Sequence, residues 1–387
     1  MKSVFVVGGD GLCGWANALH LSALGYQVTI LDNLSRRRID EELGSSSLSP
    51  ISSIYERIET WKNLTGRVIA FELIDVSLEY ERLATLISTA KPDTIVHFGE
   101  QRSAPYSMRS AQCARYTVDN NLNATHNILC AVARSEVNVH IVHLGTMGVY
   151  GYYGTSDNMT PEGYLPVHMY GQNVEILHPA YPGSVYHMTK TQDALMFQFY
   201  AKNYKMRITD LHQGIVWGSQ TDETILHPSL VNRVDYDETY GTVLNRFIIQ
   251  AINGIPLTVY GTGGQTRAFI NIRDSVKCIE LAIENPPENG ERPKIFNQMT
   301  ETRTLTQLAE LVAANASGTN VPATVQFIEN PRKELIENTL NVSNKQFLEL
   351  GLEPTLINAN SIQKTVEEFT LYQNRFNIRN VMPSSKW

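Results

Sequence analysis

The 387-residue chain is poor in cysteine and contains no long apolar run. Its four cysteines, Cys13, Cys113, Cys130 and Cys278, are scattered without the spacing of a metal site or a redox motif, so we expect reduced thiols and no bound metal. No run approaches the roughly 18 apolar residues of a membrane helix, which argues against membrane insertion. A strand-like run begins directly after the first two residues and leaves no room for a targeting peptide, which predicts a cytoplasmic protein.

Positive charge is also scarce. The chain has 32 Lys and Arg against 39 Asp and Glu, a net charge of −7. An acidic surface argues against nucleic acid and anionic membranes as partners. A phosphate-bearing ligand would therefore be bound by local basic groups and backbone N–H. With 42% hydrophobic and 18% charged residues, the composition is typical of a globular protein with a packed core.

In the first half of the chain, apolar β-rich runs alternate with helical patterns. Strands are expected at Ser3–Gly9, Gln27–Asp32, Arg67–Asp75, Thr94–Gly99, Val139–Thr146 and Thr209–Trp217. Helices are expected at Trp15–Leu24, Tyr80–Ala90 and Cys113–Arg134. Near-continuous apolar strands alternating with helices indicate a parallel sheet covered on both faces. The sequence therefore predicts an α/β fold with a Rossmann-type doubly wound sheet.

The pattern changes after about residue 220, where short strands mix with helices. We therefore predict a dinucleotide-binding domain over residues 1–220 and a smaller C-terminal α/β substrate lobe over 221–387, with some later elements returning to the first domain. The polar link Asn33–Gly66 is longer than a connection between neighbouring strands needs. Links of this length are usually functional or disordered, and we expect a structured flap over the ligands.

The segment Gly8–Gly14 reads Gly-Gly-Asp-Gly-Leu-Cys-Gly, follows a strand and opens a helix. Glycines allow a pyrophosphate to approach the backbone, and the helix N-terminus supplies N–H donors. The first gap is one residue longer than in the dehydrogenase fingerprint. Asp32 ends the second strand, where a carboxylate accepts from the ribose 2′-OH, so NAD is favoured; Arg36–Arg38 leave NADP open. We assign the cofactor to Gly8, Gly11, Leu12, Cys13, Gly14, Asp32, Asn33, Arg36, Asp75, Val76, Phe98 and Gly99.

Tyr186 and Lys190 are four residues apart in a predicted helix and therefore share a face. A lysine ammonium stabilises a phenolate, which can take a proton from a sugar hydroxyl while a hydride passes to NAD. Thr146, at the end of the fifth strand, can donate to the same substrate oxygen. His187 is a candidate base because a neutral imidazole acts near neutral pH; a packed helix histidine is the alternative.

The order of these features resembles the extended short-chain dehydrogenase/reductase family, the nucleotide-sugar epimerases and dehydratases, over the whole chain. The resemblance implies that Asn121 shapes the active site and that Gln213 touches the hexose. It also implies that Tyr260–Asp274 meets a nucleoside diphosphate. The cofactor residues it adds are Asn121, Tyr186, Lys190, Gln213 and Val216. The substrate residues it implies are Gln101, Arg102, Ser103, Thr146, Gln213, Asn245, Gln265, Arg267, Arg273 and Arg332.

Two segments indicate the reaction. Sugar-nucleotide 4,6-dehydratases carry Asp and Glu where this chain has Met147 and Gly148. The stretch Phe-Gly-Glu-Gln-Arg-Ser-Ala-Pro-Tyr-Ser places Arg102, flanked by Gln101 and Ser103, where epimerases have a bland Ala-Ala, and a cation there suits a small anion. Both segments resemble the branch of the family that joins sulfite to UDP-glucose, with NAD tightly bound and recycled.

Three alternatives to this reading remain open: a UDP-glucose 4-epimerase, a related dehydratase, and a catalytically silent member of the fold. The resemblance further implies a homodimer or homotetramer.

Overall fold

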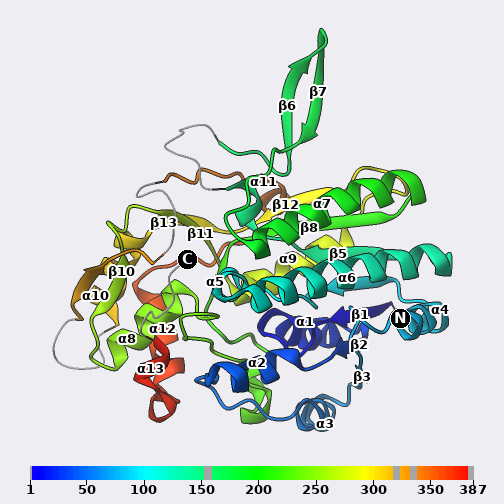
Figure 1. Cartoon of the computed structure of the whole chain (residues 1–387). Helices are drawn as coiled ribbons and strands as arrows, with labels where there is room; N and C mark the ends of the chain where they lie inside the picture. The colour runs from blue at the N-terminus through cyan, green and yellow to red at the C-terminus, as the bar shows by residue number, and fades with distance from the viewer. Residues whose placement is uncertain (1, 152–158, 317–322, 332–337, 382–387) are drawn as a thin grey trace.

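The computed structural model describes residues 2–151, 159–316, 323–331 and 338–381. Its centre is a seven-stranded parallel sheet in the order β12-β8-β5-β4-β1-β2-β3 (Figure 1). The strands are β1 (Ser3–Val7), β2 (Gln27–Asp32), β3 (Ile69–Leu73), β4 (Thr94–His97), β5 (His140–Leu144), β8 (Arg207–Gln213) and β12 (Lys294–Gln298). The order reverses between β1 and β4, which is where doubly wound sheets bind their ligands. The predicted Rossmann-type fold is confirmed.

Helices cover both faces of this sheet, as the continuous apolar character of its strands requires. One apolar core joins the sheet to α1 (Leu12–Ala23), α3 (Ile54–Thr65) and α9 (Ile272–Glu284). The other joins it to α4 (Tyr80–Ala90), α6 (Ala111–Ser135) and α7 (Val185–Tyr204). All four residues of β4 are buried. The strand ends near the switch point are thereby fixed from both sides.

Smaller sheets lie beside the main one. β9 (Ile215–Trp217), β11 (Thr266–Asn271) and β13 (Glu301–Thr304) form one, and β10 (Leu257–Tyr260) pairs with β14 (Val325–Ile328). A third apolar core packs them against α8 (Val243–Ile252), α10 (Leu305–Asn315) and α12 (Ala359–Thr370). Two elements of the C-terminal part of the chain belong with the main sheet: β12 is one of its strands, and α9 packs against it. The division at residue 220 stays a prediction.

The long link after β2 is folded: α2 (Ser35–Leu43) and α3 make up most of it. β6 (Tyr164–Met169) and β7 (Gln172–Leu177) form an antiparallel hairpin that projects from the body, at the top of Figure 1. The remaining helices are α5 (Ala104–Arg109), α11 (Lys345–Glu349) and α13 (Ile378–Val381). Among the residues that the structure describes, no helix combines the length and apolar character needed to span a bilayer.

Candidate active site

The glycine segment forms a tight turn between β1 and α1. Gly8 has a φ of +80°, in the region that favours glycine, and its N–H donates to the carbonyl of Leu31 at 2.8 Å. A Cβ on Gly14 would lie only 2.0 Å from the carbonyl oxygen of Gly8. Gly11, which caps α1, has no side chain to occupy the helix N-terminus. The turn therefore offers backbone N–H to a pyrophosphate, as NAD requires.

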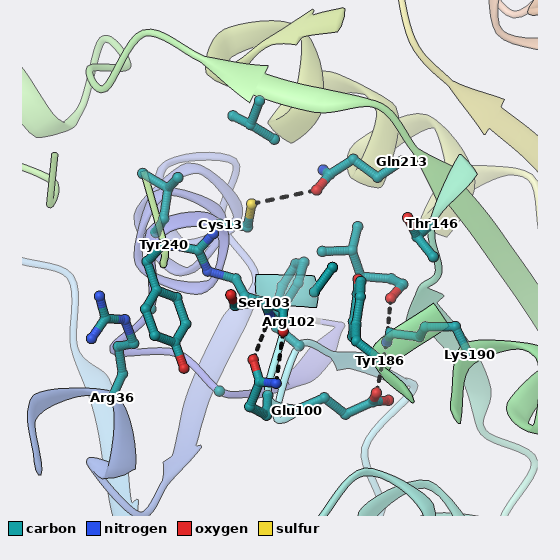
Figure 2. Close-up of a pocket in the computed structure, with 18 of the residues that line it drawn as sticks. Cys13, Arg36, Glu100, Arg102, Ser103, Thr146, Tyr186, Lys190, Gln213 and Tyr240 are labelled. Atoms are coloured by element: carbon teal, nitrogen blue, oxygen red, sulfur yellow. Dashed lines mark hydrogen bonds and ion pairs between the residues drawn. The ribbon is translucent and has the colours of Figure 1, made fainter. Parts of the chain in front are cut away.

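This turn opens on a cavity of about 400 Å³ (Figure 2). Every residue predicted to bind the cofactor lines this cavity except Asn121. The lining also includes the predicted catalytic residues Thr146, Tyr186, His187 and Lys190, and the predicted substrate residues Gln101, Arg102, Ser103, Gln213 and Arg267. Residues far apart in the sequence thus meet at the carboxyl ends of the parallel strands.

Asp32 stands at the end of β2, where the sequence predicts a ribose acceptor. Its carboxylate accepts from the N–H groups of Asp10 at 2.9 Å and Leu34 at 2.7 Å. Burial, with the neighbouring charge of Asp10, raises the pKa of Asp32 to about 6. The group is therefore mostly ionised near pH 7 and can accept a 2′-OH while repelling a 2′-phosphate.

The three arginines after β2 are engaged within the protein. Arg37 donates to both carboxylate oxygens of Asp10 at 2.6 and 2.8 Å. Arg36 pairs with Asp40 at 2.5 Å, and Arg38 donates to a main-chain carbonyl at 2.5 Å. These guanidinium groups, which could otherwise bind a 2′-phosphate, thus already pair with acceptors of the protein. This arrangement favours NAD over NADP.

The predicted catalytic residues Thr146, Tyr186 and Lys190 come from two adjoining elements. Tyr186 and Lys190 lie on the first turns of α7, and the Lys190 ammonium is 6.0 Å from the Tyr186 ring centroid. Thr146 follows β5. Burial raises the pKa of Tyr186, while the charge of Lys190 and a hydrogen bond with Thr146 oppose that rise. Lys190 thus lowers the pKa of Tyr186 as expected, but burial raises that pKa by more.

His187 occupies the space that Gly148 leaves open. A Cβ on Gly148 would lie 2.3 Å from both Cδ2 and Nε2 of the imidazole. The ring of His187 is 5.3 Å from that of Tyr186, centroid to centroid. The His187 imidazole therefore lies beside both Gly148 and the phenol of Tyr186.

Gln101 and Ser103 are held by the protein. The Gln101 amide donates to Thr117 Oγ1 at 2.9 Å, and the Ser103 hydroxyl donates to the carbonyl of Thr239 at 2.5 Å. Arg102 is 34% exposed and contacts Asp235 at 2.5 Å through Nη2. Of the three residues predicted to bind an anion, Arg102 is thus the one most open to the cavity.

Several predicted residues lie outside the cavity lining. Asn121 is buried behind the cavity lining. Its side-chain oxygen accepts from the main-chain N–H of Gln101 at 2.8 Å, and its side-chain amide donates to the main-chain carbonyl of Gln101 at 3.0 Å, so it positions a segment of the lining. Asn245 accepts from the N–H of Gly218, Gln265 is fully buried, and Arg273 pairs with Asp222. Arg332 lies outside the described residues.

The sequence analysis missed one residue of the substrate end, Arg246, which lies beside Tyr260 of the predicted Tyr260–Asp274 segment. Arg246 and Tyr260 line the cavity, and Arg246 Nη1 donates to the Tyr260 hydroxyl at 2.7 Å. Arg246 directly follows the predicted Asn245. The signal was a cation directly after the predicted Asn245, one residue further along the helix.

It also missed the residues around Lys190. The Lys190 ammonium lies 2.8 Å from Glu100 and donates to the carbonyl of Leu144 at 2.6 Å. His143 Nε2 is 3.0 Å from the same nitrogen. The available signal was the placement of ionisable residues inside otherwise apolar strands: His97 pairs in register with His143, and His143 with Asp210.

Residues 4–297 match the family described as the NAD dependent epimerase/dehydratase family. The chloroplastic UDP-sulfoquinovose synthase of Spinacia oleracea is 44% identical over 386 residues, which cover 100% of this chain and 79% of the relative. The UDP-sulfoquinovose synthase of Sulfolobus acidocaldarius is 38% identical over 387 residues, 99% of this chain and 97% of the relative.

Solved structures support the same fold. The UDP-glucose 4-epimerase of Thermotoga maritima with UDP-glucose has a TM-score of 0.71 at 21% identity, covering 96% of this chain and 99% of that one. The UDP-glucose 4-epimerase of Thermus thermophilus with NAD has a TM-score of 0.68 at 21% identity, covering 95% and 99%. The chain belongs to the NAD dependent epimerase/dehydratase family and, within it, to the UDP-sulfoquinovose synthases.

Proposed function

We propose that this protein converts UDP-glucose and sulfite to UDP-6-sulfoquinovose and water, with NAD as a recycled cofactor. The observation that carries the proposal is at the end of β5, where Met147 and Gly148 replace the dehydratase acids and the His187 imidazole fills the space beside Gly148. Two relatives matched along the whole chain bear the name of this activity, so the epimerase alternative is not favoured.

The glycine turn and Asp32 would hold NAD, since both line the cavity and the turn is too tight for a side chain at Gly14. NAD held there would supply a reversible hydride acceptor for C4 of the sugar. Tyr186 takes the proton of the C4 hydroxyl on its phenolate oxygen, and Thr146 donates a hydrogen bond to the same substrate oxygen. Lys190 stabilises the phenolate.

The resulting C4 ketone acidifies the proton on C5. His187 removes that proton and delivers it to the C6 hydroxyl, which departs as water and leaves a double bond between C5 and C6. Sulfite adds in its protonated form: its sulfur lone pair attacks C6, and the proton that it brings passes through His187 to C5. Tyr186 finally returns its proton to the C4 oxygen. One imidazole thus serves as base and acid, because the C5 proton leaves with the water and the protonated form of sulfite supplies its replacement.

Arg102 is the proposed sulfite ligand. Arg102 lines the same cavity as Cys13 and Tyr186, and its positive charge lowers the pKa values of both groups against the larger effect of their burial. Figure 2 shows the three side chains around the same space. A guanidinium has five donors, and one of its nitrogens contacts Asp235. The remaining donors suit an anion that must attack near Tyr186.

The UDP end of the substrate would lie at the other end of the cavity. Arg246, Tyr260 and Arg267 line it there, and guanidinium groups suit a pyrophosphate. Gln213 lies between Cys13 and the hexose position proposed here, with its Oε1 3.9 Å from the thiol. A cytoplasmic location and a homodimer or homotetramer stay predictions from the sequence.

Incubation of the purified protein with UDP-glucose and sulfite, followed by mass spectrometry, tests the proposal. We expect UDP-sulfoquinovose. Conversion to UDP-galactose without any sulfur-containing product would overturn it in favour of an epimerase.

A further inference from the structure

A group of buried ionisable side chains lies next to Lys190, at the centre of the main sheet. His97, His143 and Asp210 occupy paired positions on the adjacent strands β4, β5 and β8. Glu100 follows β4. The side chain of each of the four is at most 2% exposed. Unpaired charges are rarely buried to this degree, so the contacts among these groups must compensate their desolvation.

Glu100 is the centre of the group. One carboxylate oxygen lies 2.8 Å from the Lys190 ammonium, an ion pair marked in Figure 2. The other lies 3.1 Å from His143 Nε2 and accepts from the Thr125 hydroxyl at 3.1 Å. His143 Nδ1 is in turn 2.8 Å from Asp210. One oxygen of Glu100 therefore faces the Lys190 ammonium in an ion pair, and the other accepts a hydrogen bond from Thr125.

The remaining titratable groups around Glu100 are His97, at 3.3 Å, and Asp193 on α7, whose carboxylate is 3.6 Å from His143. Burial, with the neighbouring charge of Glu100, raises the pKa of Asp193 well above its usual value. Burial would also raise the pKa of Glu100, but Lys190 and the two imidazoles hold it well below its usual value.

Glu100, His143 and Asp193 have ligand atoms within 4.8 Å of one another, a spacing that would suit a metal ion. The Lys190 ammonium already supplies a cation there, 2.8 Å from Glu100 and 3.0 Å from His143. The arrangement is therefore that of a buried carboxylate–ammonium pair, with Glu100 as the charged anion.

The two charges of this pair have opposite effects on the pKa of Tyr186. Next to the effect of burial, the charge of Lys190 lowers the pKa of the phenol and that of Glu100 raises it. In the proposed reaction, Tyr186 takes the C4 proton and must keep it while C5 loses a proton, C6 loses water and sulfite adds. A lysine without a counter-charge would favour the phenolate throughout, and the proton would pass to other acceptors before the hydride returns.

We propose that Glu100 is a positioning residue for the Tyr186–Lys190 pair: it holds the Lys190 ammonium and offsets its charge, so that Tyr186 retains the proton of the C4 hydroxyl until C4 is reduced again. This inference rests on the proposed function. The step is balanced, since the O–H proton lost from the C4 hydroxyl forms the Tyr186 O–H bond and returns to the same oxygen at the end.

The test is the pH dependence of C4 oxidation, followed as absorbance of bound NADH after rapid mixing with UDP-glucose in the absence of sulfite. Glu100→Gln keeps the shape and removes the charge, and should move the midpoint of the rate profile to lower pH by about one unit. Glu100→Asp keeps the charge and should retain the wild-type midpoint. Glu280→Gln, a carboxylate of α9 paired with His20, is the matched control and should not move it.

A lower rate for Glu100→Gln at every pH with an unmoved midpoint would overturn the inference, because a purely structural role has that signature. An upward shift would also overturn it. Tyr186→Phe separates this inference from the proposed function. If that variant still forms NADH, the proposed function fails; if it forms none while the Glu100→Gln midpoint is unmoved, only the role of Glu100 fails.

Thermal unfolding gives a readout without catalysis, and it applies even where Glu100→Gln alone folds poorly. Lys190→Gln leaves Glu100 buried without its cation, whereas the double variant Lys190→Gln with Glu100→Gln removes both charges. Breaking a buried pair costs more than replacing it. We expect the double variant to unfold at the higher temperature of the two, and a lower temperature would show that Glu100 is not the counter-charge of Lys190.

Discussion

Replacing Gly148 by alanine should displace the His187 imidazole and leave the fold intact. The new Cβ would stand 2.3 Å from Cδ2 and Nε2 of the ring, and ordinary contact begins at 3.4 Å, so the ring must move by about 1 Å. The clash is with the far end of a flexible side chain. The backbone of Gly148 lies outside the left-handed region, so alanine brings no conformational strain.

The consequence for chemistry is selective. A displacement of about 1 Å costs on the order of 100-fold in rate when the moved group reacts. The account assigns His187 to C5 and Tyr186 to C4. Gly148→Ala should therefore slow exchange of the C5 proton about 100-fold while C4 oxidation stays close to wild type.

The assay uses UDP-glucose in D2O without sulfite, with deuterium at C5 measured by mass spectrometry and bound NADH measured by absorbance. Gly183→Ala is the control, because its Cβ would stand 3.8 Å from the His187 ring, an ordinary contact. Unchanged C5 exchange in Gly148→Ala, or equal loss of both steps, would refute the assignment of His187.

Three further variants test other parts of the structure. Arg102→Ala should raise the KM for sulfite about tenfold or more and spare C4 oxidation; initial rates measure both, and an equal loss would count against the anion site. Asp10→Asn leaves Arg57, which is 1% exposed, without its carboxylate, and should lower the free energy of unfolding by about 3–5 kcal/mol; an unchanged denaturation midpoint would contradict this. Burial lowers the pKa of His20, but Glu223 and Glu280 raise it above 6.5 overall. The two ion pairs of His20 therefore contribute stability that is complete below pH 6.5 and lost as pH rises through the folded pKa. His20→Gln should accordingly lower the unfolding temperature more at pH 6 than at pH 9, and the reverse order would refute a stabilising role of the two His20 ion pairs.

The main sheet was predictable because buried parallel strands are continuous apolar runs, and every predicted run but one corresponds to a single strand. The run Thr209–Trp217 was read as a single strand and is two. β8 ends at Gln213 and β9 begins at Ile215, in a different sheet. A Cβ on Gly214 would lie 2.9 Å from the carbonyl of Ala268, so the break depends on a distant strand that hydrophobicity does not reveal.

The site divides in the same way. The glycine turn and the Tyr186–Lys190 pair follow from local spacing, which is why the sequence was sufficient to place them on the cavity. The partner of Lys190 was not predictable, because Glu100 lies 90 positions away and meets it only through the order of strands. Asn245 was chosen where Arg246 lines the cavity, since a one-residue step on a helix changes the face by about 100°.

The central claim is that one C4 hydride leaves the sugar and returns while sulfite adds at C6. It is tested most directly with UDP-glucose deuterated at C4, sulfite and catalytic amounts of the protein without added NAD. The account predicts many turnovers to UDP-sulfoquinovose that retains deuterium at C4, measured by mass spectrometry. UDP-galactose as the product, or a sulfonated product that has lost the deuterium, would contradict it.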